Sequence, residues 1–265
     1  MFFSFSAKQQ RFLFVLMRFS AYMLAFFVAT IVIIDEFPEI RKKVKKIIYK
    51  IVKPEIPSVM NMRILKNLQA GGHTVFIRHS AREEIKNLNI FDQLSMVEEI
   101  EIPPPFFKGG CLNPQGKTEA WLIGEVFRKL NISVGEVYAS PTCRTRETAK
   151  MAFNRIDLIA PELYYNNFFV GTGYGTKETR IKNKKKVLEL IKVIPAIGKN
   201  NIIVAHSGML RDLGWSNSNL KESGIFIFKH VSDLNVEVVT EITLGKFIGA
   251  MRLEGMLGSA KKGES

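Results

Sequence analysis

The stretch Thr74-Val75-Phe76-Ile77-Arg78-His79-Ser80-Ala81-Arg82 joins a short apolar run to a group of cationic and imidazole side chains. A short, partly β-branched apolar run of this kind indicates a buried strand. Two later stretches have the same organisation. Glu136–Ala139 runs into Ser140-Pro141-Thr142-Cys143-Arg144, and Asn201–Ala205 runs into His206-Ser207-Gly208. Three predicted strands therefore each end in polar side chains of a similar kind.

Helical and strand-like patterns alternate around these three runs. Helical spacing is found at residues 60–69, 117–130, 145–153 and 180–194 and from Gly208 onward, whereas residues 224–228 and 236–242 alternate like strands nearer a sheet edge. This order predicts an α/β fold with a mostly parallel central sheet and helices on both faces. In such a sheet the carboxyl ends of the strands line one crevice, where ligands bind. The polar ends of the three strands are therefore expected to meet.

The side chains expected in this crevice carry almost no negative charge. They are two histidines and three arginines: Arg78, His79, Arg82, Arg144 and His206. A pocket of this composition suits a small dianion such as a phosphoryl group. Arginine binds phosphate through its planar, bidentate and permanently charged guanidinium. A neutral imidazole nitrogen in the same pocket is a competent nucleophile toward phosphorus.

Four motifs resemble those of the histidine phosphatase superfamily, also called phosphoglycerate-mutase-like. Phe76–Ser80 matches the Arg-His-Gly signature, with serine in place of glycine, and Val204–Gly208 fits the late histidine. Leu112–Ala120 is similar to the family's Leu-x-x-x-Gly-x-x-Gln-Ala helix start. Tyr138–Ala149 resembles its Ser-Pro-x-x-Arg-x-x-x-Thr-Ala segment. The resemblance covers about residues 72–245.

The resemblance implies a role for each member of the expected pocket. His79 would be the nucleophile and would carry a transient phosphohistidine. Arg78 and Arg144 would clamp the phosphoryl oxygens, and His206 would complete the cage. Arg82 falls where the acid-phosphatase branch of the family has a further phosphate-binding arginine. Positive groups preorganised around a phosphoryl group supply a large part of the catalysis of its transfer.

The sequence departs from the family pattern at two places. Ser80 replaces the signature glycine and is expected beside the substrate. The general acid is also missing from its usual places, because the acid-phosphatase branch has aspartate after the late histidine and this chain has Ser207. The candidate acids are Glu162, Glu83 and Glu84, each of which could equally be a solvated surface charge. An enzyme without a strong acid favours good leaving groups, and this argues for hydrolysis over transfer.

The predicted function is therefore a phosphohydrolase that cleaves a phosphomonoester or similar group through a phosphohistidine on His79. No metal and no organic cofactor is expected, because four scattered histidines do not form a ligand cluster. The alternative is a catalytically weak or inactive phosphoryl-binding or scaffold module. Cys111 and Cys143 flank motif residues; they could pair in an oxidising compartment and would be reduced in a cytosol.

Outside this domain, residues 12–34 are apolar except for Arg18 and a few small polar residues. At about 1.5 Å per residue, this segment forms a helix of roughly 35 Å, long enough to span a bilayer. An uncleaved, single-pass transmembrane anchor is the expectation. A signal peptide and a buried core helix are the alternatives. The predicted domains are residues 1–57 for the anchor and a basic juxtamembrane linker, 58–252 for the phosphatase domain, and 253–265 for a flexible tail.

The charge distribution bears on partners and on orientation. Of the net charge of +13, residues 1–60 contribute +6, and this concentration argues against a nucleic-acid partner. Seven Lys and Arg residues at positions 41–53 follow the apolar segment, and the positive-inside rule then favours a cytoplasmic catalytic domain. Residues 41–52 have the pattern of a basic amphipathic helix, which either lies on anionic lipid or is solvated. A membrane location points to a phosphorylated substrate that is linked to lipid or to the envelope.

Overall fold

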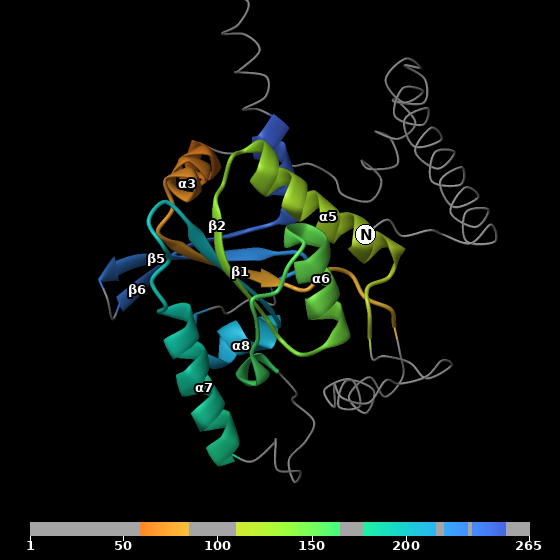
Figure 1. Cartoon of the computed structure of the whole chain (residues 1–265), viewed down its shortest axis with the longest axis vertical. Helices are drawn as coiled ribbons and strands as arrows, with labels where there is room; N and C mark the ends of the chain where they lie inside the picture. The colour runs from red at the N-terminus through yellow and green to blue at the C-terminus, as the bar shows by residue number, and fades with distance from the viewer. Residues whose placement is uncertain (1–58, 85–109, 165–176, 216–219, 233–234, 253–265) are drawn as a thin grey trace, which may run out of the picture. The chain divides into compact units, whose positions relative to one another are not determined.

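The computed structural model describes residues 59–84, 110–164, 177–215, 220–232 and 235–252 (Figure 1). The expected anchor at residues 12–34, the basic linker up to residue 57 and the tail at 253–265 lie outside the described residues. Among the residues described, none of the helices combines the length and apolar character that a bilayer crossing requires.

The described residues form one six-stranded mixed sheet (Figure 1). Its strands run in the spatial order β3-β2-β4-β1-β5-β6. The pairs β1–β4, β2–β4 and β2–β3 are parallel, in keeping with the mostly parallel sheet expected from the sequence, whereas β5 is antiparallel to both β1 and β6. The bounds are β1 His73–Arg78, β2 Val134–Ala139, β3 Leu158–Ile159, β4 Asn200–Ala205, β5 Ile225–Ser232 and β6 Asn235–Ile242.

Helices connect most of these strands. They are α3 Val59–Ala70, α5 Pro114–Lys129, α6 Cys143–Phe153, the 3₁₀ turn η1 Pro161–Leu163, α7 Lys177–Ile191, α8 Ser207–Asp212 and a further helix over residues 244–252. Helix α3 ends at two glycines, Gly71 and Gly72, whose positive φ angles of 82° and 80° are readily adopted only by glycine. The short strand β3 and η1 were not predicted from the sequence.

The sheet buries apolar side chains on both faces, because successive side chains of a strand point to opposite faces of the sheet. On one face, Phe76 of β1 and Ile203 of β4 pack in a core with residues of α7 and α8. On the other face, Val75 and Ile77 are fully buried. In the helical layer that includes α5 and α6, the ring of Phe127 contacts those of Phe153 and Phe247. This two-sided burial confirms the expectation of helices on both faces.

The central strands of the sheet end at one rim. The amide of His79 donates to the carbonyl of Ala205 at 3.0 Å, and the amide of Ser140 donates to the carbonyl of Val204 at 3.0 Å. These bonds extend the parallel pairing past the ends of β1, β2 and β4. The residues that follow the three strands are thereby held beside one another.

Candidate active site

Two imidazole rings meet at this rim. The ring centroids of His79 and His206 are 5.4 Å apart, and the rings are inclined at 61°. Only 4% of His79 and 5% of His206 is exposed. Residues separated by 127 positions in the sequence are therefore brought into one buried pair, as the strand pattern predicts.

The surroundings of His79 fix both its tautomer and its charge. Its Nδ1 lies 2.9 Å from the backbone oxygen of Ser80. A carbonyl can only accept, so Nδ1 carries the hydrogen and Nε2 keeps its lone pair. Burial, followed by the positive charge of Arg144, holds the pKa of His79 well below its ordinary value. The imidazole is therefore neutral at neutral pH and has the electron pair that a nucleophile needs.

His206 is oriented by a hydroxyl from the neighbouring strand end. Its Nε2 lies 3.1 Å from the Oγ of Ser140, which is completely buried. Burial lowers the pKa of His206 well below its usual range, and the charge of Arg144 acts in the same direction. Sequence reasoning assigned no role to Ser140. Its position directly after β2 was the signal that could have identified it.

Two arginines surround the imidazoles with positive charge. Arg78, at the end of β1, donates from Nη1 to the carbonyl of Leu220, and its Nη2 lies 3.8 Å from Oε1 of Glu222. The Nε of Arg78 is buried and has no hydrogen-bond partner among the described residues. Arg144 lies in the first turn of α6, is 5% exposed, and acts electrostatically on both histidines. This group of positively charged side chains is therefore suited to binding an anion.

Arg82 lies at the outer side of this group. It is half-buried, and its Nη1 donates to the carbonyl of Glu83 at 2.9 Å. Its charge contributes to the lowered pKa of His79 and of His206, which places it within electrostatic reach of both. Asn113, the N-cap of α5, fixes the backbone here by donating from Nδ2 to the carbonyl of Arg82 at 3.0 Å.

The three carboxylates proposed from the sequence are not brought to His79. Glu83 and Glu84 are exposed, and Glu162 lies in η1 after the edge strand β3. None of them is among the charges that shift the pKa of His79 or His206. A described carboxylate that does lie next to one of the arginines is Glu222, in the loop before β5, which approaches Arg78. Sequence reasoning did not select it because no motif marks that loop.

A buried polar network supports the backbone behind His79. The amide of Ser80 donates to Oγ1 of Thr148 at 3.0 Å, and the amide of Ala81 donates to Oε2 of Glu119 at 3.1 Å. The hydroxyl of Ser223 lies 2.8 Å from that of Ser80 and 2.7 Å from Oε2 of Glu119. The side chain expected beside the substrate, Ser80, is thus fully buried in this network. The backbone carbonyl of Ser80 orients the ring of His79, because it accepts a hydrogen bond from Nδ1 of that ring.

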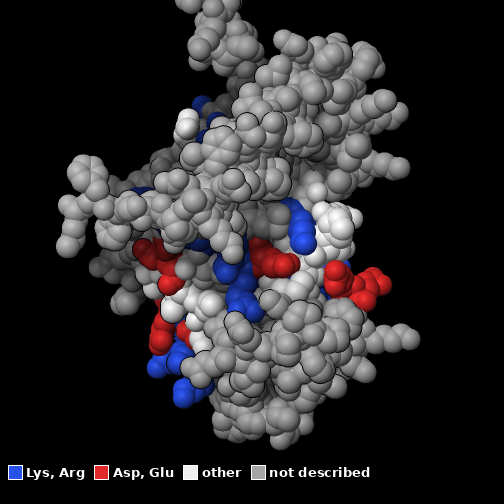
Figure 2. All heavy atoms as spheres, turned by 45° about the vertical axis from the view of Figure 1, so that its right-hand side comes forward, with Lys and Arg blue, Asp and Glu red and all other residues white. Residues whose placement is uncertain are grey.

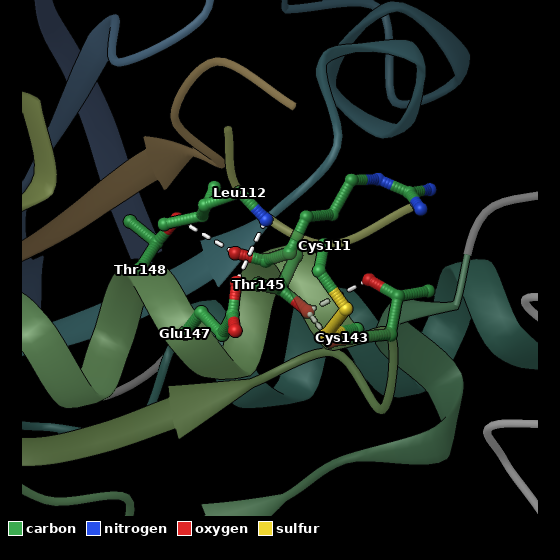
Figure 3. The surroundings of a disulfide bond; sticks show 8 residues. Cys111, Leu112, Cys143, Thr145, Glu147 and Thr148 are labelled. Atoms are coloured by element: carbon green, nitrogen blue, oxygen red, sulfur yellow. Dashed lines mark hydrogen bonds between the residues drawn. A yellow bond between two sulfur atoms is a disulfide. The ribbon is translucent and has the colours of Figure 1, made fainter. Parts of the chain in front are cut away.

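A disulfide lies next to this group (Figure 3). Cys111 and Cys143 are bonded, with their Cα atoms 4.9 Å apart, and the amide of Leu112 donates to Oε2 of Glu147 at 2.7 Å. Both contacts attach the segment before α5 to α6, beside Arg144. Cys111, Cys143 and Glu147 are also the only described His, Cys, Asp or Glu side chains close enough together to share a metal ion. In the disulfide, however, the two sulfurs are not thiolate ligands.

The surface charge of the described residues is mixed. On the face shown in Figure 2, Lys and Arg side chains lie beside Asp and Glu side chains.

No model of a known protein family matches the chain, and no curated protein matches it. Solved structures that are similar to it include a phosphoserine phosphatase from Entamoeba histolytica bound to 3-phosphoglyceric acid (13% identity, TM-score 0.43, 66% of this chain and 98% of that chain). Another is the protein histidine phosphatase SixA with tungstate (13% identity, TM-score 0.43, 65% of this chain and 97% of that chain). A third is a mycobacterial glucosyl-3-phosphoglycerate phosphatase with inorganic phosphate (14% identity, TM-score 0.45, 66% of this chain and 99% of that chain). At these identities and scores, the functional argument depends on the residues of the site.

Proposed function

We propose that the chain is a phosphohydrolase of the histidine phosphatase type, which cleaves a phosphomonoester or a similar phosphoryl group through a phosphohistidine on His79. The observation that carries the proposal is the state of His79. It is a buried, neutral imidazole whose Nδ1–H is committed to the Ser80 carbonyl, and it lies against His206 within a group of arginines. A neutral imidazole with a free lone pair close to guanidinium groups supports phosphoryl transfer to nitrogen.

In the proposed reaction, Nε2 of His79 attacks phosphorus. The N–P bond forms as the bond from phosphorus to the leaving oxygen breaks, and the leaving oxygen takes up a proton. Arg78 and Arg144 bind the equatorial oxygens, where charge is spread in the transition state, and His206 completes the cage. Water then attacks phosphorus, the N–P bond breaks, and phosphate leaves with His79 again neutral. Every bond that forms or breaks involves the substrate, water or His79.

Turnover of p-nitrophenyl phosphate by the full chain tests the proposal. His79→Ala removes the nucleophile and is expected to lower kcat by at least about 1,000-fold. His230→Ala is the matched control, because His230 contacts Thr74 at the opposite end of β1 and is expected to retain near-normal activity. Equal rates for wild type and His79→Ala would contradict the proposal.

A trapping experiment separates catalysis from binding alone. Rapid acid-free denaturation during turnover of a ³²P-labelled substrate is expected to leave acid-labile, base-stable label on His79, as a phosphoramidate requires. If instead phosphate stabilises the wild type against heat while no turnover and no label are found, the chain is the inactive phosphoryl-binding module.

A further inference from the structure

We propose that Glu222 is the proton donor to the leaving group in the reaction described above. The inference rests on the proposed function and adds the acid that its first step requires. It is carried by the position of Glu222 beside Arg78, in a loop that also holds the backbone of His79.

The loop that carries Glu222 is attached to the site on both sides of this residue. Two residues before it, the carbonyl of Leu220 accepts from Nη1 of Arg78. Immediately after it, the amide of Ser223 donates to the carbonyl of His79 at 3.1 Å, and the carbonyl of Gly224 accepts from the amide of Arg78 at 3.0 Å. The backbone at Glu222 is therefore fixed relative to the nucleophile and to a phosphate-binding arginine.

The carboxyl group of Glu222 lies beside the guanidinium of Arg78 and is partly open to solvent. Its Oε1 is 3.8 Å from Nη2 of Arg78, and 34% of its side chain is exposed. A group in this position can reach the oxygen that leaves toward solvent while Arg78 holds the phosphoryl oxygens. The other nearby carboxylate, Glu119, is buried, and both its oxygens already accept hydrogen bonds from Ala81, Gln115 and Ser223.

The surroundings favour the protonated form that a donor needs. Partial burial raises the pKa of Glu222, and Glu119 raises it further, whereas Arg78, Arg82 and Arg144 oppose the shift. A phosphoryl dianion bound by these same arginines offsets their positive charge and adds negative charge beside Glu222. Substrate binding is therefore expected to strengthen the tendency of Glu222 to hold a proton.

With Glu222 as donor, every proton that moves in the reaction has a source and an acceptor. In the first step the carboxyl O–H bond of Glu222 breaks as its proton moves to the leaving oxygen, while the N–P bond to His79 forms. In the second step the resulting carboxylate takes a proton from the attacking water as the N–P bond breaks. Glu222 ends each cycle protonated, and no further reactant is needed.

The benefit of protonating the leaving group depends on its basicity, and two substrates with different leaving groups therefore test the inference. p-Nitrophenolate leaves at neutral pH without protonation, whereas the alkoxide of β-glycerophosphate does not. Glu222→Gln is expected to lower kcat/KM for β-glycerophosphate by about 100-fold or more, and for p-nitrophenyl phosphate by less than about fivefold. Glu162→Gln is the matched control and is expected to change neither value.

A second measurement distinguishes proton donation from the positioning of Arg78. With β-glycerophosphate the wild type is expected to lose activity as rising pH deprotonates Glu222, and this alkaline limb is expected to disappear in Glu222→Gln but remain in Glu222→Asp. Equal losses on both substrates, with an unchanged pH profile, would overturn the inference and leave Glu222 a positioning residue. A wild type inactive on both substrates would count against the proposed function itself.

Discussion

At the scale of single residues, the same features that attract a phosphoryl group also keep the nucleophile reactive. Burial lowers the pKa of both His79 and His206, and the positive charge of Arg144 acts in the same direction. A protonated imidazole in this pocket would have no lone pair and would add to an already positive cage. Neutral histidines surrounded by guanidinium groups are therefore the stable state of the site at neutral pH.

This arrangement predicts how folding stability depends on pH. Both histidines have a lower pKa in the folded chain than the ordinary 6.5 of an unfolded chain. Below about pH 6.5 the unfolded state therefore binds more protons, and stability falls with acidification, by up to about 1.4 kcal/mol per pH unit for each histidine. Urea unfolding at pH 7.5 and 5.5 is expected to give the lower midpoint at pH 5.5.

The variant His206→Gln tests whether the candidate active site contributes to this pH dependence of folding stability. His73 and His230 also have lowered pKa values through burial, so the whole chain has more than one contributor. His206→Gln removes one titrating ring and keeps a polar side chain near Ser140, and it is expected to reduce the difference between the two pH values. An unchanged difference would show that His206 is not buried as a neutral group.

The residues that could be predicted from the sequence are those that directly follow a buried strand. Arg78, His79 and His206 come at the ends of β1 and β4, so a strand pattern alone places them at one rim. Glu222 could not be found in this way. It reaches Arg78 only because β5 pairs with β1, and that pairing is set by long-range packing and not by any local motif.

At the scale of elements, the approach of α5 to the loop after β1 positions the nucleophile from behind. Asn113 caps α5 by accepting from the amide of Gly116 at 2.8 Å, and its own amide donates to the carbonyl of Ala81 at 3.2 Å. A Cβ atom at Gly116 would overlap that same carbonyl. Gly116 thus permits backbone contact between α5 and the loop that carries His79.

Gly116→Ala is therefore expected to displace residues 79–82 and to lower kcat by at least about tenfold, because small displacements of catalytic groups are costly. Gly198→Ala is the matched control. Gly198 has a φ of 72° with open space around its Cβ position, so alanine there is expected to destabilise the fold by about 1 kcal/mol without affecting kcat. Steady-state kinetics and thermal unfolding of both variants check this. Full activity in Gly116→Ala would contradict the proposed contact.

Most elements could be predicted because their apolar periodicity is strong, and the elements that were missed have weak local signals. Strand β3 has two residues, too few to show alternation, and forms because Tyr138 and Ala139 of β2 pair with it. The direction of β5 was also open. An alternating pattern indicates a strand and an exposed face but not whether the chain runs parallel or antiparallel to its neighbour.

At the scale of the whole molecule, two features point to opposite compartments. One is the expectation from the sequence that basic residues after an N-terminal anchor place the domain in the cytoplasm. The other is the bond between Cys111 and Cys143, which is of a kind that persists in oxidising surroundings. The bond also attaches the segment before α5 to the helix that carries Arg144. The redox state of this pair therefore concerns both the location of the domain and the integrity of its site.

With the disulfide formed, an alkylating reagent added to intact cells before lysis is expected to leave both cysteines unlabelled until a reductant is supplied. Mass spectrometry of the peptides that contain Cys111 and Cys143 measures this. The single variant Cys111→Ser is the control, because Cys143 then has no partner and must be labelled directly. Direct labelling of both cysteines in the wild type would show a reduced pair and a domain on the reducing side.

The chain leaves the rim of the sheet after Arg82 and returns at Leu112, and these two residues form an isolated bridge while the amide of Glu83 donates to the carbonyl of Cys111 at 3.0 Å. Residues 82–83 and 111–112 are thus joined by backbone hydrogen bonds of their own. Since closing a longer loop between fixed ends costs little additional entropy, insertions of very different length and composition can be exchanged at this junction.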